Sequence, residues 1–370
     1  MSYLTIFIRR KIDKYIFYAL CRFFSVFKAD SMLDKNNIKK ILVIKLWALG
    51  DSVVLLPTLV ALKKQFPNAK LHILAHPKNR VVFENQPFID KIIDFGVPNI
   101  LGLFRKYDVC IDSEPALNVS AVISFLSSRY SIGFSHGTRA RLYDETSLFD
   151  KNKHMVQNYL DLARKIGVEY DADKLIPLVT SKKDRRFVSD FLRKNHVLKN
   201  DFTVGITPGV AESVKFRMWP LEKVAELSDI LIEKHHAKII FIGANSDKEL
   251  VNKIRSMVKG EAIDASGLFT VKQSAELIRN CNIVISNDSG MMHVAAAMGT
   301  KTIGLFGPNT PKLWAPYGKH NISIFKPKKG CPFIDNTDPN LTPKHLTHEQ
   351  MTCMDAITVN DVVKAVERIR

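Results

Sequence analysis

Short apolar runs that alternate with helix-like stretches are the feature that most constrains the fold of this chain. The run ILVIK at residues 41–45 is apolar up to its last residue, as expected of a strand that is covered on both faces of a sheet. Strand-like runs recur at 70–75, 91–95 and 107–112, with helical stretches at 52–66 and 116–128. This alternation predicts right-handed βαβ units around a parallel sheet.

The same pattern begins again in the second half of the chain. A helical stretch at 155–166 is followed by polar sequence, and TSKKDRR at 180–186 is typical of a boundary between domains. Beyond it we expect strands at 202–207, 238–243, 282–286 and 301–306 and helices at 221–235, 247–258, 271–280, 291–298 and 359–369. The predicted fold class is therefore α/β, with two Rossmann-like doubly wound domains. Because ligands of such sheets bind at the carboxyl ends of the strands, we expect a central cleft between the two domains.

The domain boundaries follow from these changes in pattern. The first Rossmann-like domain is assigned to residues 36–180 and the second to residues 181–355. Residues 1–35 form a basic N-terminal segment, and residues 356–370 form a C-terminal helix. A chain of 370 residues is long enough for two domains of ordinary size.

The N-terminal segment has the pattern of a basic amphipathic helix. Its longest apolar run, residues 15–21, is far shorter than the roughly 20 residues of a membrane-spanning helix, and no small-residue cleavage site follows it. One arc of the helix carries Ile12, Ile16, Leu20, Phe23 and Phe27, and the other side carries Arg10, Lys11, Lys14 and Arg22. Two interpretations stay open: a helix lying in the interface of an anionic membrane, and a helix packing its apolar stripe on the protein itself.

The amino-acid composition limits which classes of binding partner and which cellular compartment we expect. Lys and Arg total 54 against 37 Asp and Glu, a net charge of +17, which favours anionic partners such as phosphates, nucleic acid or an anionic membrane. No helix-turn-helix, zinc-finger or RNP-type signature supports nucleic acid. The five cysteines are scattered and odd in number, which argues against a disulfide framework and indicates a reducing compartment. We expect a cytoplasmic protein, peripheral on the inner face of the cytoplasmic membrane if the N-terminal helix binds lipid.

Several cofactor signatures are missing from the sequence. It has no G-x-G-x-x-G after the first strand and no P-loop motif, which weighs against a nicotinamide dehydrogenase and a P-loop phosphotransferase. H-E-x-x-H and C-x-x-C are also absent, so neither a metal site nor a cofactor is predicted. An irregular zinc set of Cys331, His345, His348 and Cys353 is the alternative.

The turn after the first strand is one candidate site. Gly50 permits a tight turn there, and Asp51 or Ser52 is expected to cap the next helix. At the carboxyl edge of the sheet, the Asp51 carboxylate can act as general base on an incoming hydroxyl. A helix N-terminus favours the ionised form of such a carboxylate. The alternative is that Asp51 is only a helix cap.

A second candidate is the segment TPGVAESVKFRMWP at 207–220, which follows the first strand of the second domain. Gly209 lets the backbone approach a ligand closely, and Ser213, Lys215 and Arg217 supply donors for a phosphate. Pro220 is expected at the first position of the following helix. The alternative is a solvated basic loop.

The third candidate is the turn NDSG at 287–290, which opens a helix. Free N–H groups and the dipole at a helix N-terminus suit a diphosphate. Asp288 would repel phosphate, so we expect it to bind a sugar hydroxyl or to hold the turn. His293 lies in the first turn of the helix near the same site, with a purely structural histidine as the alternative.

Together these segments resemble glycosyltransferase family 9, the bacterial heptosyltransferases of lipopolysaccharide core assembly. The segment NDSGMMHVAAAMGTKTIGLFGPNTPKLWAPYG looks like the hallmark of the family, and ILVIKLWALGDSVVLLPTLVALKKQFPNAKLHILA resembles its N-terminal signature. RMWP and the late CMDAITVNDVVKAV match its donor-domain loop and its C-terminal helix. The resemblance extends in order over about residues 38–370.

The resemblance implies a GT-B architecture in which the first domain takes the acceptor and the second takes a nucleotide sugar, commonly ADP-heptose. It implies no metal and no other cofactor. Asp51 matches the family's catalytic base, and Arg217 matches a basic position that contacts the donor's phosphate. The implied donor-binding residues are Thr207, Gly209, Ser213, Lys215, Asp247 (ribose), Phe269 (adenine pocket), Asp288, Ser289, Gly290 and His293.

The implied reaction is the inverting transfer of a heptose from ADP-heptose to the inner core of lipopolysaccharide. Asp51 would take the proton of the acceptor hydroxyl, and Arg217, Lys215 and the helix terminus at 288–290 would stabilise the departing diphosphate. Candidates for binding the acceptor's anionic groups, if they are more than a solvated basic surface, are Lys45, Arg129, Arg139, Arg141 and Lys153. The alternatives are a same-family transferase with a different nucleotide sugar or acceptor, and a non-catalytic nucleotide-sugar binding protein.

Overall fold

Two α/β units make up the chain, as seen in a computed structural model that describes residues 11–28, 31–335, 337 and 346–370. Unit 1 comprises Met1–Ala172 and Asp335–Leu341, and unit 2 comprises Asp173–Ile334 and Thr342–Arg370. The main boundary therefore lies eight residues before the predicted one between residues 180 and 181. The N-terminal segment belongs to unit 1 and the C-terminal helix to unit 2.

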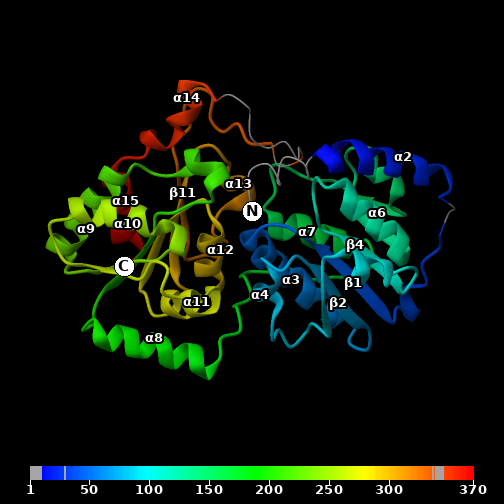
Figure 1. The fold of residues 1–370 in the computed structure, drawn as a ribbon, viewed down its shortest axis with the longest axis horizontal. Helices are drawn as coiled ribbons and strands as arrows, with labels where there is room; N and C mark the ends of the chain where they lie inside the picture. Colours follow the sequence, from blue (N-terminus) through cyan, green and yellow to red (C-terminus); the bar gives the residue numbers. More distant parts are fainter. Residues whose placement is uncertain (1–10, 29–30, 336, 338–345) are drawn as a thin grey trace. The chain divides into compact units, whose positions relative to one another are not determined.

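Unit 1 is built on a six-stranded parallel sheet in the order β3-β2-β1-β4-β5-β6 (Figure 1). Its strands are β1 (Lys40–Lys45), β2 (Lys70–Ala75), β3 (Lys91–Asp94), β4 (Tyr107–Asp112), β5 (Ser128–Phe134) and β6 (Glu145–Ser147). Its helices include α3 (Leu49–Gln65), α4 (Arg80–Phe83), α5 (Val97–Leu101), α6 (Asn118–Ser127), the 3₁₀ turn η3 (Thr138–Leu142) and α7 (Met155–Arg164). Apolar residues of β1, β2 and β4 form the core with α6.

Unit 2 repeats this topology with the sheet order β12-β11-β10-β7-β8-β9. Its strands are β7 (Thr203–Thr207), β8 (Lys238–Phe241), β9 (Ala262–Asp264), β10 (Ile283–Asn287), β11 (Lys301–Phe306) and β12 (Ile322–Phe325). The helices that the site and the core use are α8 (Lys182–Lys194), η4 (Glu212–Arg217), α9 (Leu221–His235), η5 (Asn245–Asp247), α10 (Lys248–Met257), α11 (Val271–Arg279), α12 (Gly290–Ala297), α13 (Pro311–Trp314) and α15 (Val359–Ile369). Helices α9 and α15 close its core over β7, β8, β10 and β11.

Both sheets have the strand order of a doubly wound fold, in which the chain reverses direction next to its first strand. That switch point lies between β1 and β4 in unit 1 and between β7 and β10 in unit 2. In register, Ile44 of β1 pairs with Asp112 of β4, and Thr207 of β7 pairs with Ser286 of β10. The segments that follow these four strands are therefore the places where a ligand is expected.

The predicted strands and helices lie within a few residues of the observed ones, but several elements were not predicted. The polar stretch that we assigned to a boundary opens α8, whose N-terminus is capped reciprocally by Ser181 and Asp184. The seven-residue strand β5 and the shorter strands β6, β9 and β12 were also missed. Strand β5 follows α6 directly, without the Gly or Pro turn that normally marks a strand in sequence.

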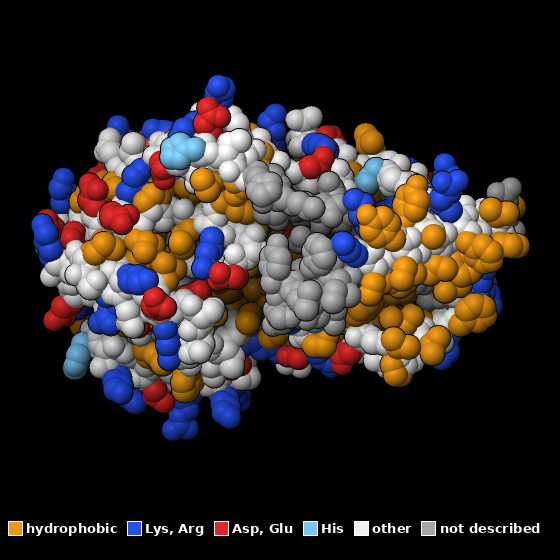
Figure 2. Space-filling view, turned by 45° about the horizontal axis from the view of Figure 1, so that its top comes forward, with side chains coloured by type: hydrophobic (Ala, Val, Ile, Leu, Met, Phe, Trp, Pro, Cys, Tyr) orange, Lys and Arg blue, Asp and Glu red, His pale blue; other side chains and the backbone are white. Residues whose placement is uncertain are grey.

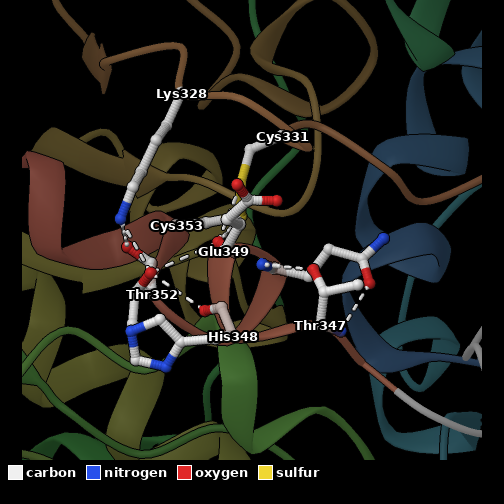
Figure 3. Close-up of a disulfide and its surroundings, with 8 residues drawn as sticks. Lys328, Cys331, Thr347, His348, Glu349, Thr352 and Cys353 are labelled. Atoms are coloured by element: carbon white, nitrogen blue, oxygen red, sulfur yellow. Dashed lines mark hydrogen bonds between the residues drawn. A yellow bond between two sulfur atoms is a disulfide. The ribbon is translucent and has the colours of Figure 1, made fainter.

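The cysteines depart from the expectation of a chain without disulfides. Cys331 and Cys353, 22 residues apart with Cα atoms 6.0 Å apart, form a disulfide, whereas Cys21, Cys110 and Cys281 are free and buried. Figure 3 shows the disulfide beside α14 (His348–Met351), where the Lys328 ammonium donates to the Thr352 hydroxyl. The disulfide occupies two sulfur ligands of the alternative zinc set, and His345 lies outside the described residues.

The N-terminal segment packs on unit 1 through only part of its apolar surface. It forms a π-helical turn, η1 (Asp13–Phe17), that continues into α2 (Tyr18–Val26). Phe17, Leu20, Cys21 and Phe24 pack on α6 and on Leu142 and Tyr143. The predicted stripe is thus divided, because Ile12, Ile16, Phe23 and Phe27 remain exposed. No helix in the described part of the chain is long and apolar enough to cross a bilayer.

Candidate active site

The first group of candidate residues lies at the switch point of the unit 1 sheet. Lys45 is the last residue of β1, and Glu114 lies two residues beyond the end of β4. Asp51 lies in the first turn of α3. The neighbouring strands β1 and β4 thereby bring one ammonium and two carboxylates to the same sheet edge.

The turn that positions Asp51 differs from the predicted one. Helix α3 begins at Leu49 with Ala48 as its N-cap residue, so Asp51 is not the cap, and no side chain caps this helix. The left-handed backbone lies at Ala48, with a φ of 59°, whereas Gly50 is helical and buried. Asp51 still lies near the positive end of the helix dipole, which favours a carboxylate there.

A buried ion-pair cluster joins these residues. The Lys45 ammonium lies 3.5 Å from Oδ2 of Asp51 and 3.4 Å from Oε1 of Glu114, and it donates to the Tyr159 hydroxyl of α7 at 3.2 Å. The side chain of Lys45 is 0% exposed and that of Glu114 is 4% exposed, whereas Asp51 is 26% exposed. Asp51 is therefore the member of the cluster that a substrate can reach.

The charged groups of this cluster shift one another's pKa values. Burial alone would lower the pKa of Lys45, but Glu114, Tyr159 and Asp51 together raise it above its ordinary value, so the ammonium stays charged. Burial raises the pKa of Glu114 above its ordinary value, against the lowering effect of Lys45. The charged ammonium therefore remains beside the Asp51 carboxylate.

Glu114 also fixes the backbone between β1 and α3. Its Oε1 accepts the N–H groups of Leu46 and Trp47, at 2.6 and 3.1 Å. Neither Glu114 nor Tyr159 was predicted as a site residue. Glu114 could have been suspected because it directly follows a predicted strand, whereas nothing local to Tyr159 in the sequence points to this site.

The second group lies at the switch point of the unit 2 sheet, where an asparagine links three segments. Asn287 ends β10; its Nδ2 donates to the Pro208 carbonyl at 2.7 Å, and its Oδ1 accepts the Trp219 N–H at 3.1 Å. The loop after β7 and the RMWP segment are thus held against β10. Trp219, which precedes Pro220, is buried. Pro220 was predicted as the first residue of the following helix, but it is the N-cap residue of α9.

Arg217 is held by Asp288 in this group. Its Nη1 lies 3.0 Å from Oδ2 of Asp288, and the same oxygen accepts Nδ2 of Asn309 at 2.9 Å. Asp288 is buried, whereas the Arg217 side chain is 18% exposed. Its Nε is buried and has no hydrogen-bond partner among the described residues. The Asp288 carboxylate thus positions a guanidinium that is partly open to a ligand. Asn309 was not predicted.

Helix α12 starts beside this pair. Ser289 is its N-cap residue and makes no side-chain cap hydrogen bond, and Gly290 is the first helical residue. The Thr207 hydroxyl donates to Ser286 at 2.6 Å, and the Ser286 and Ser289 hydroxyls lie 3.2 Å apart. His293 is buried, with its ring 5.9 Å from that of Trp314 in an edge-on arrangement. The first turn of α12 therefore presents backbone donors next to Arg217, which suits an anion.

Gly209 and Asp247 also come together. A Cβ on Gly209 would lie 2.6 Å from the Asp247 carboxyl carbon, so only glycine leaves room for that side chain. The Asp247 carboxylate also accepts the Ala244 N–H at 2.7 Å. This close approach explains the glycine after β7 as a packing requirement of the loop.

Three further residues predicted for the donor site have no described contact with Arg217 or Asp288. Lys215 forms an exposed ion pair with Glu212 of the same 3₁₀ helix, at 2.7 Å, and Ser213 is exposed. Phe269 packs edge-on against Phe187 and Phe191 of α8, with ring centroids 5.5 and 5.0 Å away. The described contacts of Phe269 are thus to a helix that the sequence analysis did not predict.

The candidates for binding an anionic acceptor divide by burial. Arg129 and Arg141 are exposed, and Lys153 is paired with Asp161. Arg139 was expected at the surface but is buried, with its Nη2 2.7 Å from Oδ2 of Asp112. Its guanidinium is a structural group inside unit 1, and Lys45 is likewise enclosed in the cluster described above. Arg129 and Arg141 are exposed, and the Lys153 side chain is 36% exposed, as expected of acceptor-binding residues.

In the described part of the chain, no group of three or more His, Cys, Asp or Glu residues could hold a metal ion. Both switch points carry charged and hydrogen-bonding side chains.

Comparison with known proteins shows to which family the chain belongs. Residues 102–341 match the family described as glycosyltransferase family 9 (heptosyltransferase), which is well over half of the chain. The chain belongs to this family. It is therefore a glycosyltransferase of the heptosyltransferase type, as the sequence motifs predicted.

The similarity to individual relatives and solved structures covers more of this glycosyltransferase than the family match does. Lipooligosaccharide heptosyltransferase 2 of Haemophilus ducreyi is 27% identical over 311 residues, which cover 77% of this chain and 88% of the relative. A glycosyl transferase family 9 structure from Veillonella parvula has a TM-score of 0.74 at 23% identity and covers 92% of this chain and 99% of that one. The E. coli ADP-heptose LPS heptosyltransferase II structure has a TM-score of 0.69 at 21% identity, covering 89% and 98%. These likenesses confirm the GT-B fold.

Proposed function

We propose that this glycosyltransferase moves a heptose from ADP-heptose to a sugar of the lipopolysaccharide inner core. The observation that carries the proposal is the Arg217–Asp288 pair beside the first turn of α12, at the switch point of a sheet that the family match includes. The E. coli ADP-heptose LPS heptosyltransferase II has the same fold. A positioned guanidinium and a helix N-terminus together form a receptor for the diphosphate of such a donor.

Asp51 is the general base of the proposed reaction. Its carboxylate accepts the proton of the acceptor hydroxyl as that oxygen forms a bond to the anomeric carbon. The buried Lys45 ammonium, 3.5 Å from Oδ2 of Asp51, keeps the carboxylate ionised and restricts its position. General base catalysis contributes about 10²–10⁴-fold in rate, so Asp51 supplies a substantial part of the catalytic power.

Arg217 and the first turn of α12 act on the leaving group. The bond between the anomeric carbon and the diphosphate oxygen breaks, and its electron pair leaves with ADP, with inversion at that carbon. The developing negative charge is stabilised by donors that are already in place, which is the most effective form of electrostatic catalysis. Asp288 and Asn309 position Arg217 for this task.

The experiment combines nucleotide binding with sugar transfer. Calorimetric titration with ADP, UDP and GDP tests the nucleotide, and transfer from ADP-heptose to a core acceptor tests the reaction. Asp51→Asn should bind ADP as the wild type does and lose about 10²–10⁴-fold in transfer. Arg217→Gln should lose about 10²–10³-fold in transfer and bind ADP more weakly.

A matched control is Arg193→Gln, which removes an exposed arginine on α8 that is paired only with a neighbour in its own helix. It should leave both readings unchanged. Preference for UDP or GDP over ADP would refute the proposed donor. Near-wild-type transfer by Asp51→Asn would remove Asp51 from the mechanism.

A further inference from the structure

The N-terminal helix of unit 1 has two apolar sides, and only one of them is covered by the described part of the protein. The inner side carries Cys21, which is fully buried, and Phe17, Leu20 and Phe24, which pack on α6. The outer side carries Phe23, Val26 and Phe27, which are 57%, 78% and 67% exposed, together with exposed Ile12, Tyr15 and Ile16. We call these last six residues the outer face.

The inner contacts fix the direction in which the outer face points. Asp13 is buried, and its carboxylate accepts the N–H groups of Val119 at 2.8 Å and Asn118 at 3.1 Å. These two N–H groups belong to the first turn of α6, so Asp13 caps that helix from another segment of the chain. The helix cannot turn its outer face inward without breaking this cap and exposing Cys21.

The outer face is continuous with a wider apolar surface of unit 1. The Phe23 and Phe24 rings lie 5.5 Å apart, Phe24 contacts Phe125 of α6 at 5.8 Å, and Arg105 lies 5.7 Å from the Phe125 ring. Phe104, the residue before Arg105, is 66% exposed. Figure 2 shows hydrophobic side chains gathered on the side of the molecule where Figure 1 draws α2 and α6. A surface of this kind marks an interaction site on a folded protein.

The charged residues beside the outer face indicate what kind of partner binds it. Lys11, Lys14 and Arg22 are exposed beside the outer face, and Asp13, the only carboxylate between Lys11 and Lys28, is buried. A second copy docking through the same patch would bring these like charges together. Anionic phospholipid headgroups would instead attract them while the apolar side chains enter the acyl boundary.

We propose that the outer face docks this glycosyltransferase on a bilayer surface that contains anionic phospholipid. The helix lies in the plane of the membrane interface, with the outer face in the lipid and the three basic residues among the headgroups. The inner side of the helix stays packed on α6, so the whole of unit 1 is held at the membrane surface. This docking does not depend on which sugar the enzyme transfers.

Vesicle flotation of the full chain tests the proposal, with vesicles of phosphatidylcholine alone and of phosphatidylcholine mixed with phosphatidylglycerol. The wild type should float with the mixed vesicles and less with the neutral ones. The triple variant Ile16→Ser/Phe23→Ser/Phe27→Ser should lose about tenfold or more in binding, because burial of apolar side chains sets the affinity. The variant Lys11→Gln/Lys14→Gln/Arg22→Gln should lose the preference for phosphatidylglycerol.

A matched control removes equally exposed apolar residues elsewhere, as in Leu148→Ser/Leu198→Ser/Met351→Ser, and should bind like the wild type. Circular dichroism and melting temperature verify that each variant is folded. Failure of the full chain to bind the mixed vesicles, or equal binding by the outer-face variant, overturns the proposal. Concentration-dependent dimerisation that the outer-face variant abolishes, in a chain that does not bind vesicles, would assign the face to a second copy.

Discussion

Replacing Lys45 by Met is the change that most directly tests the buried cluster beside Asp51. The substitution keeps a long side chain of similar volume but removes the ammonium that lies 3.4 Å from Glu114 and 3.5 Å from Asp51. Glu114 is then a buried carboxylate without a cation. Removing one partner of a buried ion pair costs about 3–5 kcal/mol, whereas the partly exposed contact with Asp51 adds less than about 1 kcal/mol.

The cost should depend on pH in a defined direction. Burial already holds the pKa of Glu114 above its ordinary value, and Lys45→Met removes the cation that lowers it. A carboxyl whose folded pKa is raised favours the folded state when protonated, and that stability is lost as pH rises through the folded pKa. The difference from the wild type should therefore shrink as the pH falls and Glu114 takes up a proton, and it should grow toward its full size, about 3 kcal/mol, as the pH rises.

Scanning calorimetry measures this effect as a fall in melting temperature. For a unit of this size, about 3 kcal/mol corresponds to a fall of roughly 6–12 °C. The double variant Lys45→Met/Glu114→Gln should recover most of the loss, because the Gln oxygen can still accept the Leu46 and Trp47 N–H groups. A pH-independent loss, or a double variant as unstable as the single one, would refute the reasoning.

Two further substitutions test packing at other points. Gly209→Ala places a methyl group 2.6 Å from the Asp247 carboxyl carbon, so it should cost unit 2 about 1–3 kcal/mol and weaken ADP binding in the same calorimetric titration; unchanged stability would show that Asp247 moves freely. Asp13→Ala removes the cap of α6 and should cost about 1–3 kcal/mol in urea unfolding. Asp34→Ala, which removes an exposed cap of a 3₁₀ turn, is its control and should cost less than about 1 kcal/mol; equal costs would contradict the role of Asp13.

Much of the fold was predictable because its signals are local. The strands at 70–75, 107–112 and 301–306 were predicted to the residue, since each is an apolar run bounded by polar or turn residues. Helix α8 was missed because its amphipathic pattern, with Val188 as its only buried residue, looks like a solvated charged stretch. Its role in covering Phe269 becomes visible only when distant segments are placed together.

The site was predictable only in part, for the same reason. Asp51, Arg217 and Asp288 lie in turns after apolar strands, where the doubly wound fold collects ligand-binding groups. Their partners are distant in sequence: Glu114 lies 69 residues from Lys45 and Asn309 lies 21 residues from Asp288. Arg139 shows the converse error, since an arginine in a basic stretch was assigned to the surface although Asp112 and Tyr143 hold it inside.

At both switch points a buried charged side chain holds an oppositely charged side chain that is partly exposed, but the signs of the two charges are reversed. At the unit 1 sheet a buried cation, Lys45, supports a carboxylate that substrate can reach. At the unit 2 sheet a buried carboxylate, Asp288, supports a guanidinium that substrate can reach. In each case the enclosed charge offsets part of the desolvation cost of its partner and restricts its motion. In the proposed reaction this pairing serves both steps, because Asp51 must be anionic when it accepts the hydroxyl proton and Arg217 must be in place when the diphosphate departs.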